Sequence, residues 1–255
     1  MDLKMDNQKI LVCGASSGFG YEIAKKIVSE GGIPILVARS EQKLKEFKSE
    51  YPASEYLVAD LFEVNGVETV MEKVGAENLA GVLINSGGPQ PGSFSSVELS
   101  DWDRGYEVVL RWKIDLLKRL LPVFQKRNYG RIVFIESVSV KQPLDGLILS
   151  NVFRIAVKGL MKSIVNEMEG YNITLNLLAP GYHRTDRLNQ LIAKQSEESG
   201  LSQSEIAENM AAKTPLRSLG DPASLAQLGA WLLSSQNSYV TGQSFVIDGG
   251  MSRGL

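Results

Sequence analysis

The sequence predicts an α/β fold in which one parallel sheet is covered by helices on both faces. Seven short apolar runs alternate with amphipathic helical patterns along the 255 residues, and no repeat, linker or low-complexity stretch interrupts them. The first run ends in a glycine-rich turn that leads directly into a helical pattern. Strands separated by helices of this length lie parallel and need a helical layer on each face. We therefore expect a single three-layer domain over 1–255.

Each apolar run is short and bounded by polar or glycine-containing turns, as is typical of a buried parallel strand. The predicted strands are 9–13, 33–38, 55–59, 81–85, 131–136, 173–178 and 244–247. The predicted helices are 18–30, 41–51, 63–74, 100–127, 147–169, 186–212 and 222–235. Right-handed crossovers between parallel strands then give a three-layer doubly wound Rossmann sandwich with a parallel seven-stranded sheet.

The glycine-rich turn after the first strand has the chemistry of an anion-binding site. The strand ends at Gly14, two further glycines follow at Gly18 and Gly20, and a helical pattern begins at Tyr21. Such a turn presents backbone N–H groups and the positive end of the helix dipole to an anion. A Cβ here would clash in the turn or hold a pyrophosphate away from the backbone. The spacing G-x-x-x-G-x-G predicts a nucleotide site or, alternatively, only a tight connection.

The composition narrows the classes of function. With 27 Lys and Arg against 29 Asp and Glu, the net charge of −2 favours neither nucleic acid nor an anionic membrane as a partner. The single Cys13 and single His183 leave no nitrogen or sulfur cluster for a metal. Cys13 lies in a predicted strand, where we expect a small buried hydrophobe rather than a reactive thiol. Residues 1–9 do not resemble a signal peptide and no apolar run reaches membrane-spanning length, so we expect a cytoplasmic protein.

The ends of the next strands indicate which nucleotide binds. The second strand ends at Ala38, followed by Arg39 and Ser40. A carboxylate at this place would bond to the ribose of NAD, whereas an arginine accommodates the 2′-phosphate of NADP. Since Ala38 brings no repelling acid and the next two side chains can donate hydrogen bonds, we expect NADP(H) rather than NAD(H). Asp60, after the third strand, suits the adenine amino group, and 85–88 form a second glycine-containing turn against the cofactor.

Several motifs, in this order and at these separations, resemble those of the short-chain dehydrogenase/reductase family, in the single-domain branch that includes 3-oxoacyl-acyl carrier protein reductases. They are the glycine loop at 14–20, with Cys13 where threonine is usual, NSGG at 85–88, Ala179-Pro180-Gly181 with Thr185, TGQ at 241–243 and DGG at 248–250. The residues expected to contact the cofactor are Gly14, Ser16, Ser17, Gly18, Phe19, Gly20, Arg39, Ser40, Asp60, Leu61, Asn85, Ser86, Gly87, Arg154, Pro180, Gly181 and Thr185. The resemblance also implies a homotetramer or a homodimer.

The catalytic positions implied by the resemblance depart from the family pattern. The family uses a tyrosine as proton donor, a lysine four residues later, a serine that orients the carbonyl and an asparagine that holds a water. Alignment on GLMKS at 159–163 places Ser150 at the tyrosine and Arg154 at the lysine. The serine is Ser137, and the asparagine position is Val109. The chain thus resembles an atypical subgroup with Ser-x-x-x-Arg in place of Tyr-x-x-x-Lys.

These replacements leave two functions open. Arg154 keeps a positive charge for the ribose and for a developing alkoxide, but a guanidinium cannot relay protons. Ser150 keeps a hydroxyl that is far less acidic than a phenol. We expect an NADP(H)-dependent oxidoreductase that interconverts a carbonyl and an alcohol, with 3-oxoacyl compounds among the candidate substrates and Ser137, Ser150 and Arg154 as catalytic residues. The alternative is a catalytically silent NADP(H)-binding protein, acting as a sensor or an assembly partner.

Four other residues near the expected site each have two interpretations. Tyr182 is a substitute acid or a pocket wall, and His183 is a substitute acid or a surface-loop histidine. Lys141 is a substitute acid or a solvated loop charge. Glu136, next to Ser137 at a strand end, is an unusual acid or the partner of an arginine.

The substrate side of the site is expected to be formed by 86–94, 139–149 and 182–210. These segments show no charged anchor that specifies a phosphate or a carboxylate. Arg184 and Arg187 serve an anionic group or are surface arginines. The polar region within 186–213 is interpreted as a mobile helical lid or as a solvated pair of surface helices.

Overall fold

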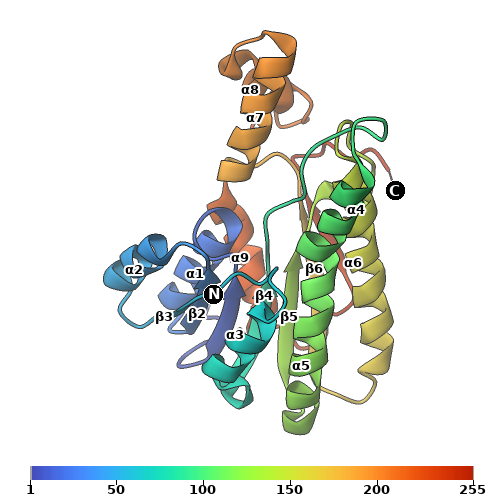
Figure 1. The fold of residues 1–255 in the computed structure, drawn as a ribbon. Helices are drawn as coiled ribbons and strands as arrows, with labels where there is room; N and C mark the ends of the chain where they lie inside the picture. Colours follow the sequence, from blue (N-terminus) through green and yellow to red (C-terminus); the bar gives the residue numbers. More distant parts are fainter. Residues whose placement is uncertain (1, 255) are drawn as a thin grey trace.

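The protein, described by a computed structural model over residues 2–254, contains one seven-stranded parallel sheet (Figure 1). The strands are β1 (Lys9–Cys13), β2 (Ile33–Ala38), β3 (Glu55–Val58), β4 (Leu79–Ile84), β5 (Gly130–Ile135), β6 (Ile173–Pro180) and β7 (Ser244–Ile247). Their order in the sheet is β3-β2-β1-β4-β5-β6-β7. The order changes direction between β1 and β4, and a sheet of this kind binds ligands at the carboxyl ends of its strands near that point. The predicted doubly wound fold is confirmed.

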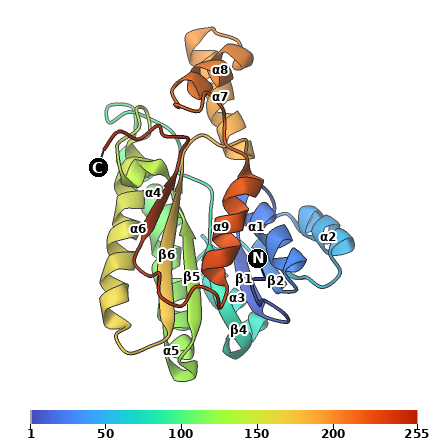
Figure 2. The same ribbon diagram turned by 180° about the vertical axis from the view of Figure 1, so that it is seen from behind.

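Helices cover both faces of the sheet (Figures 1 and 2). One face carries α1 (Gly18–Ser29), α2 (Glu41–Glu50) and α9 (Pro222–Leu233). The other carries α3 (Gly66–Val74), α5 (Trp112–Arg127) and α6 (Ile148–Glu167). A short helix, α4 (Leu99–Tyr106), precedes α5, while α7 (Asp186–Ser199) and α8 (Gln203–Ala212) stand beyond the carboxyl edge of the sheet. The crevice therefore lies between the sheet and the α7–α8 pair.

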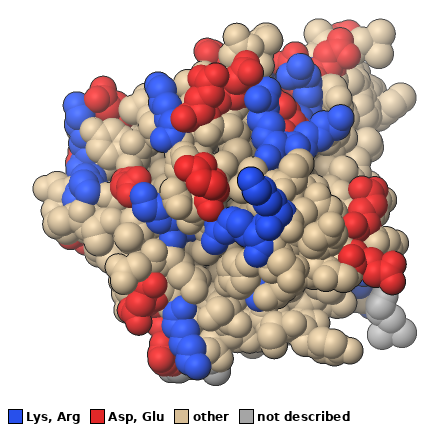
Figure 3. All heavy atoms as spheres, turned by 90° about the horizontal axis from the view of Figure 1, so that it is seen from below, with Lys and Arg blue, Asp and Glu red and all other residues tan. Residues whose placement is uncertain are grey.

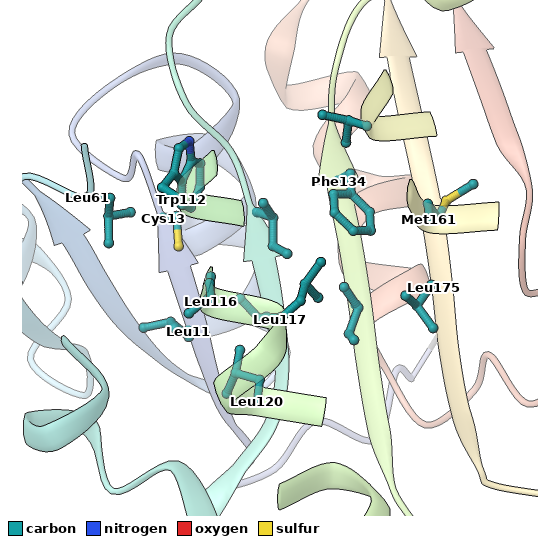
Figure 4. Packing of buried hydrophobic residues seen from close by; sticks show 14 of the residues in the cluster. Leu11, Cys13, Leu61, Trp112, Leu116, Leu117, Leu120, Phe134, Met161 and Leu175 are labelled. Carbon is teal, nitrogen blue, oxygen red and sulfur yellow. The ribbon is translucent and has the colours of Figure 1, made fainter. Parts of the chain in front are cut away.

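Alternation of side chains along the buried strands produces two separate cores. In β1, Leu11 and Cys13 face the α5 side, whereas Ile10 and Val12 face the α1 side, because successive side chains point to opposite faces. Figure 4 shows Leu116, Leu117 and Leu120 of α5 packed among the strand side chains on the first of these faces. Cys13 is fully buried there, which confirms its prediction as a small core residue.

Two predicted helices are interrupted. The segment predicted as 100–127 is divided into α4 and α5 by a π-helical turn, η2 (Glu107–Arg111). The segment predicted as 186–212 breaks at Gly200, whose φ of 73° is left-handed and ends α7. Gly200 and the capping box formed by Ser202 and Glu205 mark the second interruption in the sequence.

The face opposite the crevice, seen in Figure 3, carries Lys, Arg, Asp and Glu side chains intermixed. This mixture agrees with the net charge of −2 and provides no field of one sign on that face. Among residues 2–254, no helix combines the length and the apolar character needed to cross a membrane.

Candidate functional site

A cavity of about 600 Å³ opens at the carboxyl ends of β1, β2, β4, β5 and β6. Its floor is formed by the loops that follow these strands, and α7 contributes Leu188 and Leu191 to its wall. A pocket of this size at the switch point of a parallel sheet is where a dinucleotide and a small substrate fit together.

The glycine loop leaves the N-terminus of α1 free to bind an anion. Ser17 occupies the N-cap position, yet its side chain caps no backbone N–H group, and no acidic residue lies in the first turn. A Cβ on Gly20 would lie 2.3 Å from the carbonyl oxygen of Gly14, so only glycine permits this close return of the helix. The uncapped N–H groups border the cavity and suit the pyrophosphate of a dinucleotide.

Asn85 supports this loop from the end of β4. Its amide Nδ2 donates to the carbonyl oxygen of Gly14 at 3.2 Å, and the Asn85 side chain is buried. A Cβ on Gly14, where φ is +64°, would lie 2.8 Å from the Asn85 carbonyl oxygen. Asn85 thus fixes the glycine loop as well as lining the cavity.

The side chains after β2 and β3 lie at one end of the cavity. The Arg39 side chain is 71% exposed, with Nη1 3.8 Å from an Asp60 carboxylate oxygen. Asp60 also accepts from the backbone N–H of Phe62 at 3.0 Å, which fixes its orientation. The Arg39 guanidinium is therefore largely free to bind a group in the cavity.

The structure gathers nearly all the predicted site residues around this one cavity. Those on its wall are Gly14, Ser16, Ser17, Gly18, Phe19, Arg39, Asp60, Leu61, Asn85, Ser86, Gly87, Ser137, Ser150, Arg154, Pro180, Gly181 and Thr185. Two predicted residues do not line it. Gly20 is buried against Gly14, and the Ser40 hydroxyl caps α2 by accepting from the backbone N–H of Lys43. Both support neighbouring segments of the site.

A buried charge cluster includes Arg154, one of the predicted catalytic residues. One Glu136 oxygen accepts from Arg154 Nη1 at 2.9 Å, and the other accepts from Lys113 Nζ. The side chains of Glu136 and Lys113 are fully buried, and that of Arg154 is 9% exposed. The interpretation of Glu136 as the partner of an arginine is confirmed, and the structure adds a second cation.

Lys113 is the residue that sequence reasoning missed. It lies on α5 four residues after Val109 and four before Leu117, both of them buried. A lysine on the apolar face of a helix is the signal that could have revealed it, since buried lysines are paired or functional. Burial lowers the pKa of Lys113, while the Glu136 carboxylate opposes that shift.

Arg154 presents one edge of its guanidinium toward Ser150. Its Nε donates to the Ser150 hydroxyl at 3.0 Å, one helical turn earlier on α6. Its Nη2 lies on the same edge and reaches the loop after β4, where a Cβ on Gly88 would be 3.2 Å away. With Nη1 held by Glu136, the guanidinium is fixed in orientation and retains a donor for a bound group.

The other candidate acids have different surroundings. His183 is 5% exposed, so its interpretation as a surface-loop histidine is wrong. Its ring packs edge-on against Phe19 and lies over Gly220, and burial lowers its pKa, which favours the neutral imidazole. Tyr182 is half-buried on the cavity wall, and Lys141 is exposed, as the pocket-wall and solvated-charge interpretations predicted.

The two arginines after β6 differ sharply. Arg184 is exposed, whereas Arg187 is half-buried and lines the cavity. The Nη2 atom of Arg187 donates to the carbonyl oxygen of Pro89, in the loop after β4, at 2.7 Å. Thr185, between them, caps α7 by accepting from the backbone N–H of Leu188 at 3.3 Å. The capped turn thus directs Arg187 toward the cavity.

Comparison with known proteins identifies the family. Residues 14–252 match the protein family described as enoyl-(acyl carrier protein) reductase. The chain belongs to the short-chain dehydrogenase/reductase family. It is 31% identical to the oxidoreductase UcpA of Escherichia coli strain K12, over 97% of this chain and 95% of that protein. It is 26% identical to the NADPH-dependent reductase BacG of Bacillus subtilis, over 98% of this chain and 100% of that protein.

Solved structures show the same fold. The chain aligns with YwfH, an NADPH-dependent reductase involved in bacilysin biosynthesis, at a TM-score of 0.92 and 24% identity, covering 98% of this chain and 100% of the other. L-sorbose reductase from Gluconobacter frateurii, in complex with NADPH and L-sorbose, aligns at a TM-score of 0.91 and 24% identity over the full length of both chains. Within this short-chain dehydrogenase/reductase fold, Ser137, Ser150 and Arg154 line one cavity with the glycine loop.

Proposed function

We propose that this short-chain dehydrogenase/reductase is an NADP(H)-dependent oxidoreductase that interconverts a carbonyl and an alcohol at a non-standard active site. The observation that carries the proposal is the fixed Arg154 guanidinium, hydrogen-bonded to Ser150 and Glu136 at the wall of a cavity that also contains the glycine loop. NADPH dependence is stated for its relative BacG, in agreement with the preference predicted from Arg39.

The residues present fit the cofactor. The uncapped start of α1 suits the pyrophosphate, and the exposed Arg39 guanidinium suits the 2′-phosphate. A Cβ on Gly87 would meet nothing within 4 Å, so this position leaves open cavity space beside the loop after β4. When bound, NADP(H) supplies or accepts the hydride.

In this proposal, the side chains of α6 and of the loop after β5 hold the substrate oxygen. Ser137 and Ser150 orient a carbonyl by donating hydrogen bonds through their hydroxyl groups. Arg154 stabilises the negative charge that develops on the oxygen, and Glu136 keeps its guanidinium in place. Because a guanidinium does not release its proton and a serine is a weak acid, solvent water supplies the proton to the alkoxide.

The test is NADPH consumption with a panel of ketones, aldehydes and 3-oxoacyl thioesters, comparing wild type with Arg154→Ala. We expect the variant to lose about 10²–10³-fold in kcat/KM, the effect of removing one preorganised oxyanion donor. Its fold should persist, since Lys113 remains to pair with Glu136. Arg184→Ala, which removes the same charge from an exposed site, is the matched control and should retain activity.

Turnover that is unchanged in Arg154→Ala would place the reacting oxygen elsewhere and overturn the assignment. Binding of NADPH without turnover of any panel member would favour the second candidate, a catalytically silent NADP(H)-binding protein. The predicted replacement of the family's tyrosine by Ser150 supports this candidate, since Ser150 lines the cavity. Fluorescence titration with NADPH separates failure to bind from failure to react.

The proposed assembly is a homotetramer or a homodimer. Val152, Ile155 and Gly159 form an exposed stripe on one face of α6, with Ile155 52% exposed. Small and apolar residues at this spacing let two helices approach closely. Light scattering coupled to size-exclusion chromatography measures the state directly.

A further inference from the structure

Two guanidinium groups approach the same side of the loop after β4 at Gly88. A Cβ on Gly88 would lie 3.1 Å from Nη2 of Arg187 and 3.2 Å from Nη2 of Arg154. The two arginines come from α7 and α6, far apart in the sequence, and both line the cavity. Because Gly88 has no side chain, the space next to both Nη2 atoms is unfilled.

The cations around this point outnumber the carboxylates. Glu136 is shared between Lys113 and Arg154, so that group of three carries one excess positive charge. Within residues 2–254, no carboxylate lies within the 4.0 Å ion-pair distance of Arg187, whose Nη2 donates to the Pro89 carbonyl oxygen. Burial and the neighbouring Arg154 both lower the pKa of Arg187, as expected for a partly desolvated cation beside another cation.

Two adjacent, partly buried guanidinium groups repel each other, and a bound anion relieves this repulsion. A guanidinium group binds a carboxylate through two parallel N–H···O hydrogen bonds. Such charge-assisted bonds are about twice as strong as hydrogen bonds between neutral groups. The other acidic residues on the wall do not reach this point. Asp60 lies near Arg39, and Asp186 lies 3.7 Å from Lys43.

We infer that Arg154 and Arg187 bind a carboxylate group of the substrate, so that the enzyme acts on oxo acids. This inference rests on the proposed reductase function and names its substrate class. Nη2 of Arg154 carries two N–H groups: the one on the edge shared with Nε faces the reacting oxygen beside Ser150, and the other remains for the carboxylate, which therefore lies next to that oxygen. The carbonyl that Ser150 orients is therefore one or two carbons from the carboxylate, as in a 2-oxo or a 3-oxo acid.

The same positive site could serve the phosphates of the cofactor, and the experiment separates the two sources of negative charge. Protein saturated with NADP⁺ is titrated calorimetrically with pyruvate, benzoylformate and acetoacetate, and with the ethyl ester of each. The ester keeps the carbonyl and removes the charge. Affinity for NADPH is measured separately by fluorescence, and no turnover is required for either measurement.

We expect at least one acid to bind more tightly than its ester. Arg187→Ala should weaken that acid about 10- to 100-fold and its ester less than about threefold, since charge-assisted bonds are lost only for the acid. Arg187→Lys should bind the acid more tightly than Arg187→Ala but less tightly than wild type, because lysine keeps the positive charge but lacks the paired N–H donors of a guanidinium. Arg184→Ala, the exposed neighbour, should leave acid, ester and NADPH affinities unchanged.

Three results would overturn the inference. In the first, no acid of the panel binds more tightly than its ester. In the second, Arg187→Ala weakens acid and ester equally, which indicates that Arg187 only anchors the loop through Pro89. In the third, the variant weakens NADPH as much as the acid, which assigns the site to the cofactor. Failure of the proposed function itself differs from all three, because it appears in the wild type as absence of NADPH binding, or as NADPH binding without turnover of any carbonyl in the panel.

Discussion

Removing the carboxylate of Glu136 should destabilise the fold strongly, because it leaves two cations in a buried site. Coulomb attraction at the 2.9 Å Glu136–Arg154 distance is about 6 kcal/mol at an effective dielectric constant near 20, and desolvation offsets part of it. Breaking a buried pair by removing one partner costs about 3–5 kcal/mol. We therefore expect Glu136→Gln to lower the free energy of unfolding by about 3–5 kcal/mol, a large part of the total stability of a domain.

Urea unfolding at fixed protein concentration, followed by tryptophan fluorescence, measures this loss. In Glu136→Gln/Lys113→Met one cation is also removed, so the double variant should be more stable than Glu136→Gln alone. Glu55→Gln is the matched control, since Glu55 pairs with Lys9 at 2.8 Å but its side chain is 49% exposed, and it should cost less than about 1 kcal/mol. A loss below about 1 kcal/mol in Glu136→Gln, or a double variant less stable than the single one, would refute the reasoning.

Three further predictions follow from the site, the core and the exposed helix face. Arg39→Ala should raise the KM for NADPH about 10- to 100-fold and change that for NADH less than about twofold in initial-rate assays; equal changes would contradict a 2′-phosphate contact. Burial raises the pKa of the Cys13 thiol to about 12, so the folded state holds this proton more tightly than the unfolded one. The contribution of Cys13 is thus complete below about pH 8.5 and is lost as the pH rises toward 12, by up to about 1.4 kcal/mol per pH unit. Urea unfolding between pH 8 and 10.5 should show this loss in wild type and not in Cys13→Ala, and equal pH slopes would contradict it. Ile155→Glu should shift the oligomer to smaller species in light scattering, and an unchanged mass would exclude the α6 stripe as the interface.

The sequence by itself determined the sheet and the glycine loop, and it predicts that Ser150 and Arg154 depart from the family pattern. Alternating apolar runs and helical patterns predict parallel strands because local periodicity is set by burial on one or two faces. The glycines at 14, 18 and 20 are informative because only glycine permits the turn that the structure contains. The sequence also predicts that Ser150 and Arg154 lie side by side, because residues four apart on a helix lie on the same face.

Only the tertiary structure determined which charged side chains form buried ion pairs. Lys113, Glu136 and Arg154 come from three elements, and their pairing depends on how α5 and α6 pack beside β5. Arg187 differs from the exposed Arg184 because the capped start of α7 directs one toward the cavity and leaves the other outside. No local pattern distinguishes them, since burial of a charged side chain depends on partners distant in the sequence. That is the physical reason why the sequence predicted the glycine loop, which one short segment builds, and not the Lys113–Glu136–Arg154 cluster, whose members come from elements that meet only in the fold.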